Sequence, residues 1–309
     1  MHHTVRIRVP ATTANLGPGF DALGLALDLW NETDFTRRED DRIVVTISGE
    51  GADGLPTNAE NTVAAAALRL FELAGEFSLG LQIDCRNNIP LSSGMGSSAA
   101  AVLTGLLGAN ALLRKPLDRT AILKLAVELE GHPDNVAPAL LGGLVVSLDD
   151  GEEIFTYQLP PRPKRTPTHI TLVLPEFDFS TRAARAALPS HVRHADAVFN
   201  ISRAVLVAQA LSTGDVDMLA AAMADRLHQP YRLPLIPGAQ AAIDAALAAG
   251  ASGAALSGAG PSLVAFSGDH NTAVGVAMQH AFAKAGLPAR VFRLEISDIG
   301  AQVDLGKRN

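Results

Sequence analysis

The sequence contains very little cysteine and no long apolar segment. Its one cysteine, Cys85, cannot form a disulfide within the chain and cannot build a cysteine-rich metal site. A single thiol fits a reducing compartment, so we expect a cytoplasmic protein. No apolar run approaches the ~20 residues of a membrane-spanning helix. The first ten residues, MHHTVRIRVP, also lack the apolar core of a secretion signal.

An excess of positive charge is missing as well. The formal net charge is −7, whereas a protein that binds the phosphate backbone of a nucleic acid needs clustered Lys and Arg. We therefore expect neither a nucleic-acid nor a membrane partner. What is present is an ordinary globular composition, with 48% hydrophobic residues. A chain of 309 residues is longer than most domains that have a single hydrophobic core, which favours two domains.

Hydrophobic patterns in the first half predict alternating strands and helices. We expect strands over 4–9, 42–48, 79–85 and 143–148, and helices over 60–75, 97–113 and 119–131. Gly75 is expected to end the first helix as its C′ glycine, and Asp118 is expected to cap the third. Prolines and basic residues crowd positions 160–169, PPRPKRTPTH, which indicates a linker between domains.

The second half predicts strands and crossover helices in the order β-α-β-β-α-β. Strands are expected over 169–175, 252–257, 262–267 and 289–297, and helices over 238–250 and 271–286. Further helices between 180 and 227 would be insertions. This order is typical of a ferredoxin-like sheet. We therefore expect an α+β protein with two domains, residues 1–160 and 161–309.

The segment IPLSSGMGSSAA, residues 89–100, looks like a phosphate-binding loop without a lysine. It lacks the Gly-Lys-Ser/Thr ending of the commonest ATP-binding loop. Gly94 and Gly96 allow positive φ angles and a close approach of the backbone to a ligand. A helix that begins near Ser97 would offer unpaired N–H groups and the positive end of its macrodipole. Backbone amides could therefore hold phosphates, although an ordinary glycine-rich turn is the alternative for this segment alone.

Two more glycine-containing segments accompany this loop, PATTANLGPGFDALGLAL at 10–27 and SGAGPS at 257–262. In order and spacing the three segments resemble those of the GHMP kinases, over essentially the whole chain. The first segment is also similar to that of the homoserine kinases. Three other segments share this likeness: EGHPDNVAPALLGG at 130–143, STRAAR at 180–185 and PYRLPLIPG at 230–238.

The resemblance implies a fold and a reaction. The N-terminal domain would resemble the second domain of ribosomal protein S5, and the C-terminal domain would be ferredoxin-like. The reaction would be transfer of the γ-phosphoryl group of ATP, with Mg²⁺, to the side-chain hydroxyl of L-homoserine in threonine biosynthesis. A homodimer is also implied.

The resemblance further implies a nucleotide site. Its members would be Asn61, as an adenine contact, and Pro90, Leu91, Ser92, Ser93, Gly94, Met95, Gly96, Ser97, Ser98, Ala99 and Ala100. Ser98 and Glu130 would hold Mg²⁺, which prefers hard oxygen ligands and few protein contacts. Glu128 is the rival of Glu130. The loop of the third motif would contribute Gly258, Gly260 and Ser262.

A second set of side chains would face an amino-acid substrate. The set implied by the resemblance is Asn15, Asp21, His132, Asn135, Thr181, Arg185 and Arg232. An arginine fork pairs bidentately with a free carboxylate, and an aspartate pairs with an ammonium group. Taken singly, a turn aspartate and two surface arginines are ordinary features. Together they favour a zwitterion over mevalonate, which has no ammonium group.

Asn135 and His132 are the expected catalytic residues. Mevalonate kinase places an aspartate near this position as a general base, whereas the amide of Asn135 cannot usefully accept a proton. We expect Asn135 to orient the hydroxyl, whose proton passes to the phosphate, because phosphoryl transfer depends mainly on positioning and charge stabilisation. Asp134 is a rival base. Two other functions stay open, a GHMP kinase for another small alcohol and a non-catalytic binder of a nucleotide or metabolite.

Overall fold

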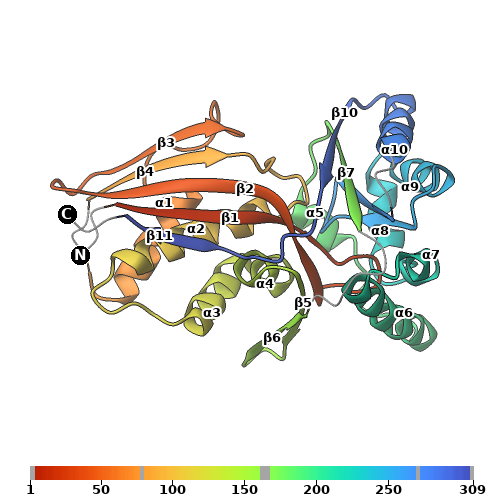
Figure 1. Cartoon of the computed structure of the whole chain (residues 1–309), viewed down its shortest axis with the longest axis horizontal. Helices are drawn as coiled ribbons and strands as arrows, with labels where there is room; N and C mark the ends of the chain where they lie inside the picture. Colours follow the sequence, from red (N-terminus) through yellow and green to blue (C-terminus); the bar gives the residue numbers. More distant parts are fainter. Residues whose placement is uncertain (1–3, 77–79, 161–167, 269–271, 307–309) are drawn as a thin grey trace.

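The computed structural model describes residues 4–76, 80–160, 168–268 and 272–306. Two β-sheets lie side by side, each with helices packed against it (Figure 1). Most of the predicted linker, residues 161–167, lies outside the described residues. Within the described residues, no helix has the length and apolarity needed to cross a membrane.

Among the residues that the structure describes, the first sheet has seven strands, of which one pair is parallel. Its strands are β1 (Thr4–Ala14), β2 (Leu23–Arg38), β3 (Ile43–Gly49), β4 (Gly80–Asn87), β5 (Leu144–Asp149), β6 (Ile154–Leu159) and β11 (Gln302–Leu305). The order is β11-β1-β2-β4-β3, and the hairpin of β5 and β6 joins at the start of β2. Only β3 and β4 run parallel in this sheet, within the described residues.

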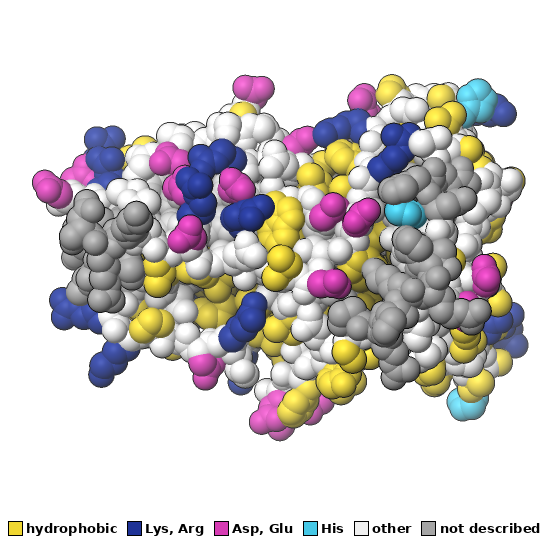
Figure 2. Space-filling view, viewed as in Figure 1, with side chains coloured by type: hydrophobic (Ala, Val, Ile, Leu, Met, Phe, Trp, Pro, Cys, Tyr) yellow, Lys and Arg dark blue, Asp and Glu magenta, His cyan; other side chains and the backbone are white. Residues whose placement is uncertain are grey.

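One side of the first sheet carries helices, and the other side carries charges. The helices are α1 (Thr62–Leu73), α2 (Ser97–Leu112), α3 (Arg119–Glu130) and α4 (Pro133–Leu141). Asp118 accepts a hydrogen bond from the Ala121 N–H at 2.8 Å, and Gly75 follows α1 with φ of 72°, so both predicted helix-end residues are confirmed. Basic and acidic side chains are interspersed over the charged side (Figure 2), where Asp34 pairs with Arg6 and Arg86.

The second sheet confirms the ferredoxin-like prediction. Strands β7 (His169–Pro175), β8 (Gly253–Leu256), β9 (Leu263–Ser267) and β10 (Ala289–Leu294) lie in the antiparallel order β10-β7-β9-β8. Helices α9 (Ala239–Ala248) and α10 (Thr272–Lys284) pack on it. The insertion contains α5 (Thr181–Ala186), α6 (His194–Thr213), η1 (Val216–Met218), α7 (Leu219–Ala222), α8 (Gln229–Arg232) and η2 (Leu233–Leu235).

The end of the chain departs from the expected division into 1–160 and 161–309. After β10 the chain crosses back, and β11 pairs antiparallel with β1, with Val5 opposite Leu305. The last strand therefore belongs to the first sheet (Figure 1). Strands β2, β6 and β11 and helix α4 were not predicted from the sequence. One hydrophobic core joins both sheets, because Ile170, Leu172 and Phe266 of the second pack with the first.

Candidate active site

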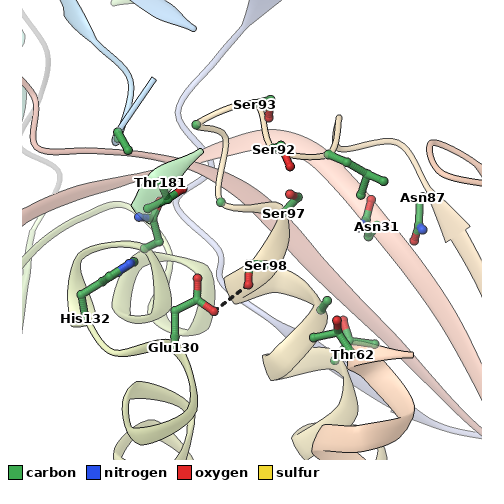
Figure 3. A pocket seen from close by; sticks show the side chains of 18 of the residues that line it. Asn31, Thr62, Asn87, Ser92, Ser93, Ser97, Ser98, Glu130, His132 and Thr181 are labelled. Atoms are coloured by element: carbon green, nitrogen blue, oxygen red, sulfur yellow. Dashed lines mark hydrogen bonds between the residues drawn. The ribbon is translucent and has the colours of Figure 1, made fainter. Parts of the chain in front are cut away.

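A cavity of roughly 320 Å³ opens where the predicted motifs meet (Figure 3). Residues from both halves of the chain line it. Those predicted from the sequence are Asn15, Asn61, Leu91, Ser92, Ser93, Gly94, Gly96, Ser97, Ser98, Glu130, His132, Asn135, Thr181, Arg185, Arg232 and Gly258. The described lining does not include Pro90, Met95, Ala99, Ala100, Asp21, Gly260 or Ser262. The volume lies at the lower end of the range of small-molecule sites.

Residues 89–100 pack closely against the other two glycine-containing motifs. A Cβ atom on Gly94 would lie 2.3 Å from the Ser257 carbonyl oxygen, in the third motif. A Cβ atom on Gly96 would lie 2.0 Å from Thr12 Oγ1, in the first. Both glycines have positive φ, 76° and 71°. Only glycine fits this geometry without strain, so the two glycines bring the three motifs together.

The N-terminus of α2 faces the cavity without a side-chain cap. Its N-cap is Gly96, and the first N–H group that donates within the helix is that of Ala100, to the Gly96 carbonyl oxygen at 2.9 Å. The preceding N–H groups have no partner within the helix, and the helix macrodipole adds positive charge there. Ser97 and Ser98 line the cavity beside these groups. The arrangement can bind an anion such as a phosphate group.

Ser98 and Glu130 are hydrogen-bonded to each other in the wall of the cavity. Ser98 Oγ donates to Glu130 Oε2 at 2.8 Å, the dashed line in Figure 3. Burial raises the pKa of the Glu130 carboxyl, and the Ser98 hydrogen bond opposes that rise. Glu128, the rival, is exposed and outside the described lining. Glu130 is therefore the glutamate that faces Ser98.

The oxygen atoms of Ser98 and Glu130 suit Mg²⁺, which takes hard oxygen ligands and keeps few protein contacts. Within the part of the chain that the structure describes, no group of three or more His, Cys, Asp or Glu side chains could hold a metal ion. A magnesium ion here would therefore rely on phosphate oxygens and water for its remaining ligands.

The start of α4 fixes the side chain of Asn135. Asn135 Oδ1 accepts from Thr12 Oγ1 at 2.8 Å, and its Nδ2 donates to Asp134 Oδ1 at 3.3 Å. Asp134 is buried, and the same oxygen lies 3.0 Å from His132 Nδ1. Burial lowers the pKa of His132, but the Asp134 carboxylate outweighs it and leaves that pKa raised. Thr12 is not among the site residues predicted from the sequence.

Asp21, Arg185 and Arg232 form a charged group that we call the clamp. The two guanidinium nitrogens Nη1 and Nη2 of Arg185 donate to the Asp21 carboxylate at 3.0 and 2.9 Å. Asn15 fixes the backbone of the first motif at Asp21, because its Oδ1 accepts from the Asp21 N–H at 2.9 Å. Its Nδ2 donates to the Gly258 carbonyl oxygen in the third motif. Asp21 and Asn15 both have positive φ, 55° and 68°.

Arg232 is the most deeply buried member of the clamp, with 1% of its surface exposed. Its Nε donates to the Ala184 carbonyl oxygen at 3.3 Å, while its buried Nη1 has no hydrogen-bond partner among the described residues. Burial, and then the nearby Arg185 charge, lower the pKa of Arg232. A buried charge without an acceptor is costly. The side chain is therefore suited to an anionic group of a ligand.

The other end of the cavity was not predicted from the sequence. Its wall there contains Asn31, Thr33, Leu55, Thr62, Val63, Cys85, Asn87, Ala101 and Thr104. Burial raises the pKa of the Cys85 thiol to about 11, so it stays protonated. Asn61 lies in this wall, but its side chain accepts from the Val63 N–H as the cap of α1 and donates to the Pro56 carbonyl oxygen.

Family models and known proteins give one consistent match. The GHMP kinase N-terminal domain matches residues 61–143, and the GHMP kinase C-terminal domain matches residues 207–284. The chain is 46% identical to the homoserine kinase of Moorella thermoacetica, over 96% of this chain and 99% of that protein. It is 42% identical to the homoserine kinase of a Synechococcus species, over 99% of both.

Solved structures agree with these matches. The homoserine kinase from Cytophaga hutchinsonii superposes with a TM-score of 0.86 at 31% identity, over 98% of both chains. A mevalonate kinase shares the fold, with a TM-score of 0.68 at 15% identity. The resemblance inferred from the motifs and the two-domain α+β fold are both confirmed. The chain belongs to the homoserine kinase family of the GHMP kinases.

Proposed function

We propose that this protein phosphorylates the side-chain hydroxyl of L-homoserine with ATP, as a step of threonine biosynthesis. The hydroxyl oxygen forms a bond to the γ-phosphorus while the bond from that phosphorus to the β,γ-bridging oxygen breaks. The products are O-phospho-L-homoserine and ADP, and the hydroxyl proton passes to a phosphate oxygen. Such a transfer depends mainly on positioning and on stabilisation of charge.

The N-terminus of α2 supports the phosphate end of this reaction. Its uncapped N–H groups would bind phosphate oxygens, and Ser98 with Glu130 would hold Mg²⁺ beside them. The magnesium ion would neutralise charge on the phosphates. Asn135, held by Thr12 and Asp134, would orient the hydroxyl of the substrate.

The observation that carries the choice of an amino acid is the clamp. A zwitterion would exchange the internal Asp21–Arg185 pair for two pairs, its ammonium group with Asp21 and its carboxylate with Arg185 and Arg232. The partnerless Nη1 of Arg232 would gain an acceptor at the same time. Mevalonate has no ammonium group and would leave Asp21 without a counter-ion.

A coupled assay of ADP release tests the proposal. L-homoserine, L-threonine and mevalonate are compared at equal concentrations with Mg-ATP, and a reaction without an alcohol gives the background hydrolysis. We expect homoserine to have the highest kcat/KM. A higher value for mevalonate would overturn the choice of substrate. ATP binding by calorimetry without turnover of any alcohol would instead identify a non-catalytic binder.

Two further expectations belong to the proposal. The homodimer implied by the family resemblance is tested by light scattering of the purified protein. A cytoplasmic location, where ATP is supplied and the Cys85 thiol stays reduced, is tested by cell fractionation.

A further inference from the structure

A buried polar cluster lies behind the clamp, outside the residues assigned above. Its centre is Asp225, and the side chains of Asp225 and His228 are both 0% exposed. Neither residue lines the cavity. A buried carboxylate is stable only when its oxygens are well supplied with donors, so its partners show what it holds in place.

Asp225 holds the turn that leads into α8. Its Oδ1 accepts from Asn200 Nδ2 at 2.6 Å and from the Leu227 N–H at 2.9 Å. Its Oδ2 accepts from the N–H groups of His228 at 2.9 Å and Gln229 at 2.6 Å. The helix that this turn begins ends at Arg232. The carboxylate therefore fixes the backbone from which the buried clamp arginine extends.

The same cluster reaches the first motif. His228 Nε2 lies 2.7 Å from the Gly17 carbonyl oxygen, and Asn200 Nδ2 lies 3.3 Å from the Pro18 carbonyl oxygen. Since a carbonyl oxygen only accepts, His228 Nε2 carries the proton. Its Nδ1 is buried without a hydrogen-bond partner among the described residues, as expected for a neutral imidazole.

Phe20 connects this cluster to the clamp. The ring of His228 stacks on it, with centroids 5.1 Å apart and planes at 25°. The guanidinium carbons of Arg232 and Arg185 lie 5.0 and 5.9 Å from the same ring centroid. Both clamp arginines are thus within the distance of a cation–π interaction with one aromatic ring.

We propose that Phe20 and His228 are positioning residues for the substrate clamp. A carboxylate beside Arg232 would occupy its N–H groups and compete with the substrate. The face of an aromatic ring stabilises the guanidinium charge but leaves those N–H groups available. The stacked ring of His228 positions Phe20. Asp225 holds the backbone of His228, and Asn200 contacts the Pro18 carbonyl oxygen two residues before Phe20. This inference rests on the proposed function.

Phe20→Leu tests the role of the ring. KM for homoserine should rise about tenfold, which corresponds to ~1.4 kcal/mol and the size of a partly desolvated cation–π contact. KM for ATP and kcat should stay unchanged, because the ring lies beside His228 and the two clamp arginines, at the proposed homoserine end of the cavity. Phe20→Tyr keeps the aromatic face and should restore the wild-type KM.

Phe282→Leu is the matched control. Phe282 is fully buried in a separate hydrophobic cluster of α9, α10 and the second sheet, and it does not line the cavity. Phe282→Leu removes the same atoms as Phe20→Leu. Its thermal stability should fall, whereas its KM for homoserine and its KM for ATP should not change. If Phe20→Leu and Phe282→Leu give the same homoserine KM, the positioning role is overturned. Absence of homoserine turnover by the wild type would overturn the proposed function instead.

His228 has its own pair of variants. His228→Gln keeps an N–H donor for the Gly17 carbonyl oxygen, whereas His228→Leu loses it. The homoserine KM should increase from wild type to Gln to Leu, with the KM for ATP constant. A homoserine KM equal to that of the wild type in both variants would show that His228 does not position the clamp.

Discussion

At the scale of single residues, we expect a Ser98 variant to affect the reaction with Mg-ATP far more than the binding of homoserine. Its hydroxyl meets Glu130 at 2.8 Å at the start of α2, and both lie on the phosphate side of the proposed reaction. Ser98→Ala should lower turnover at fixed Mg²⁺ by about tenfold or more, because the ion would lose an oxygen ligand. A Mg²⁺ titration of kcat checks this, with Ser202→Ala on the exposed side of α6 as control. Equal weakening of homoserine affinity would contradict the assignment.

Asn135 and its neighbour Asp134 give a second prediction at this scale. Asn135→Ala should lower kcat about a hundredfold, since misplacing a reacting group by ~1 Å can cost that much. Asp134→Asn should keep most of kcat, because the amide keeps an Oδ1 acceptor for His132 and Asn135 and removes only the basic carboxylate. Steady-state kinetics of both variants measure the difference. The opposite ranking would make Asp134 the general base.

At the scale of secondary-structure elements, the junction before α2 depends on Gly96. Gly96→Ala would place a Cβ atom 2.0 Å from Thr12 Oγ1 at φ of 71°. Gly75 is the matched control, because its φ is 72° and a Cβ atom there meets nothing within 4 Å. Both variants carry the backbone strain of ~1 kcal/mol or more. Only Gly96→Ala should also lose turnover. Thermal melting measures the loss of stability in both variants, and the ADP assay measures the loss of turnover.

The elements also show what the sequence could and could not reveal. Helix α2 was predicted because its start, its glycines and its apolar run are local signals. Strand β2 was not, because its first residues belong to the first motif and its outer side carries charged residues such as Glu32 and Asp34. The strand gains its place from pairing with β1, β4 and β5, which are distant in sequence.

At the scale of the whole molecule, one end of the cavity could be predicted from the sequence and the other could not. The phosphate and clamp residues lie in motifs with a resemblance to a known family, so their assembly was expected. The wall formed by Asn31, Thr33 and Cys85 has no such motif. These residues reach the cavity only through the pairing of β2 with β4, where Thr33 lies opposite Cys85. The cluster of Asp225 and His228 was missed for the same reason, because it forms only when α6, α8 and the first motif meet.

This cluster gives a prediction for global stability against pH. His228 joins the two halves of the chain through the Gly17 carbonyl oxygen, and burial lowers its pKa below the usual value. Arg232 lowers that pKa further, whereas Asp225, Asp21 and the Gly17 hydrogen bond oppose the shift. The unfolded chain therefore binds a proton near pH ~6.5 that the folded chain excludes.

The free energy of unfolding should consequently fall as the pH drops below ~6.5. His228→Gln removes this contribution, so the loss of stability between neutral and mildly acidic pH should be smaller in the variant. Urea unfolding at both pH values measures it. His132 contributes with the opposite sign, because its pKa is raised, and its contribution is common to both proteins. An equal loss in wild type and variant would mean that His228 accepts a proton in the folded state, and the neutral imidazole assigned to it would be wrong.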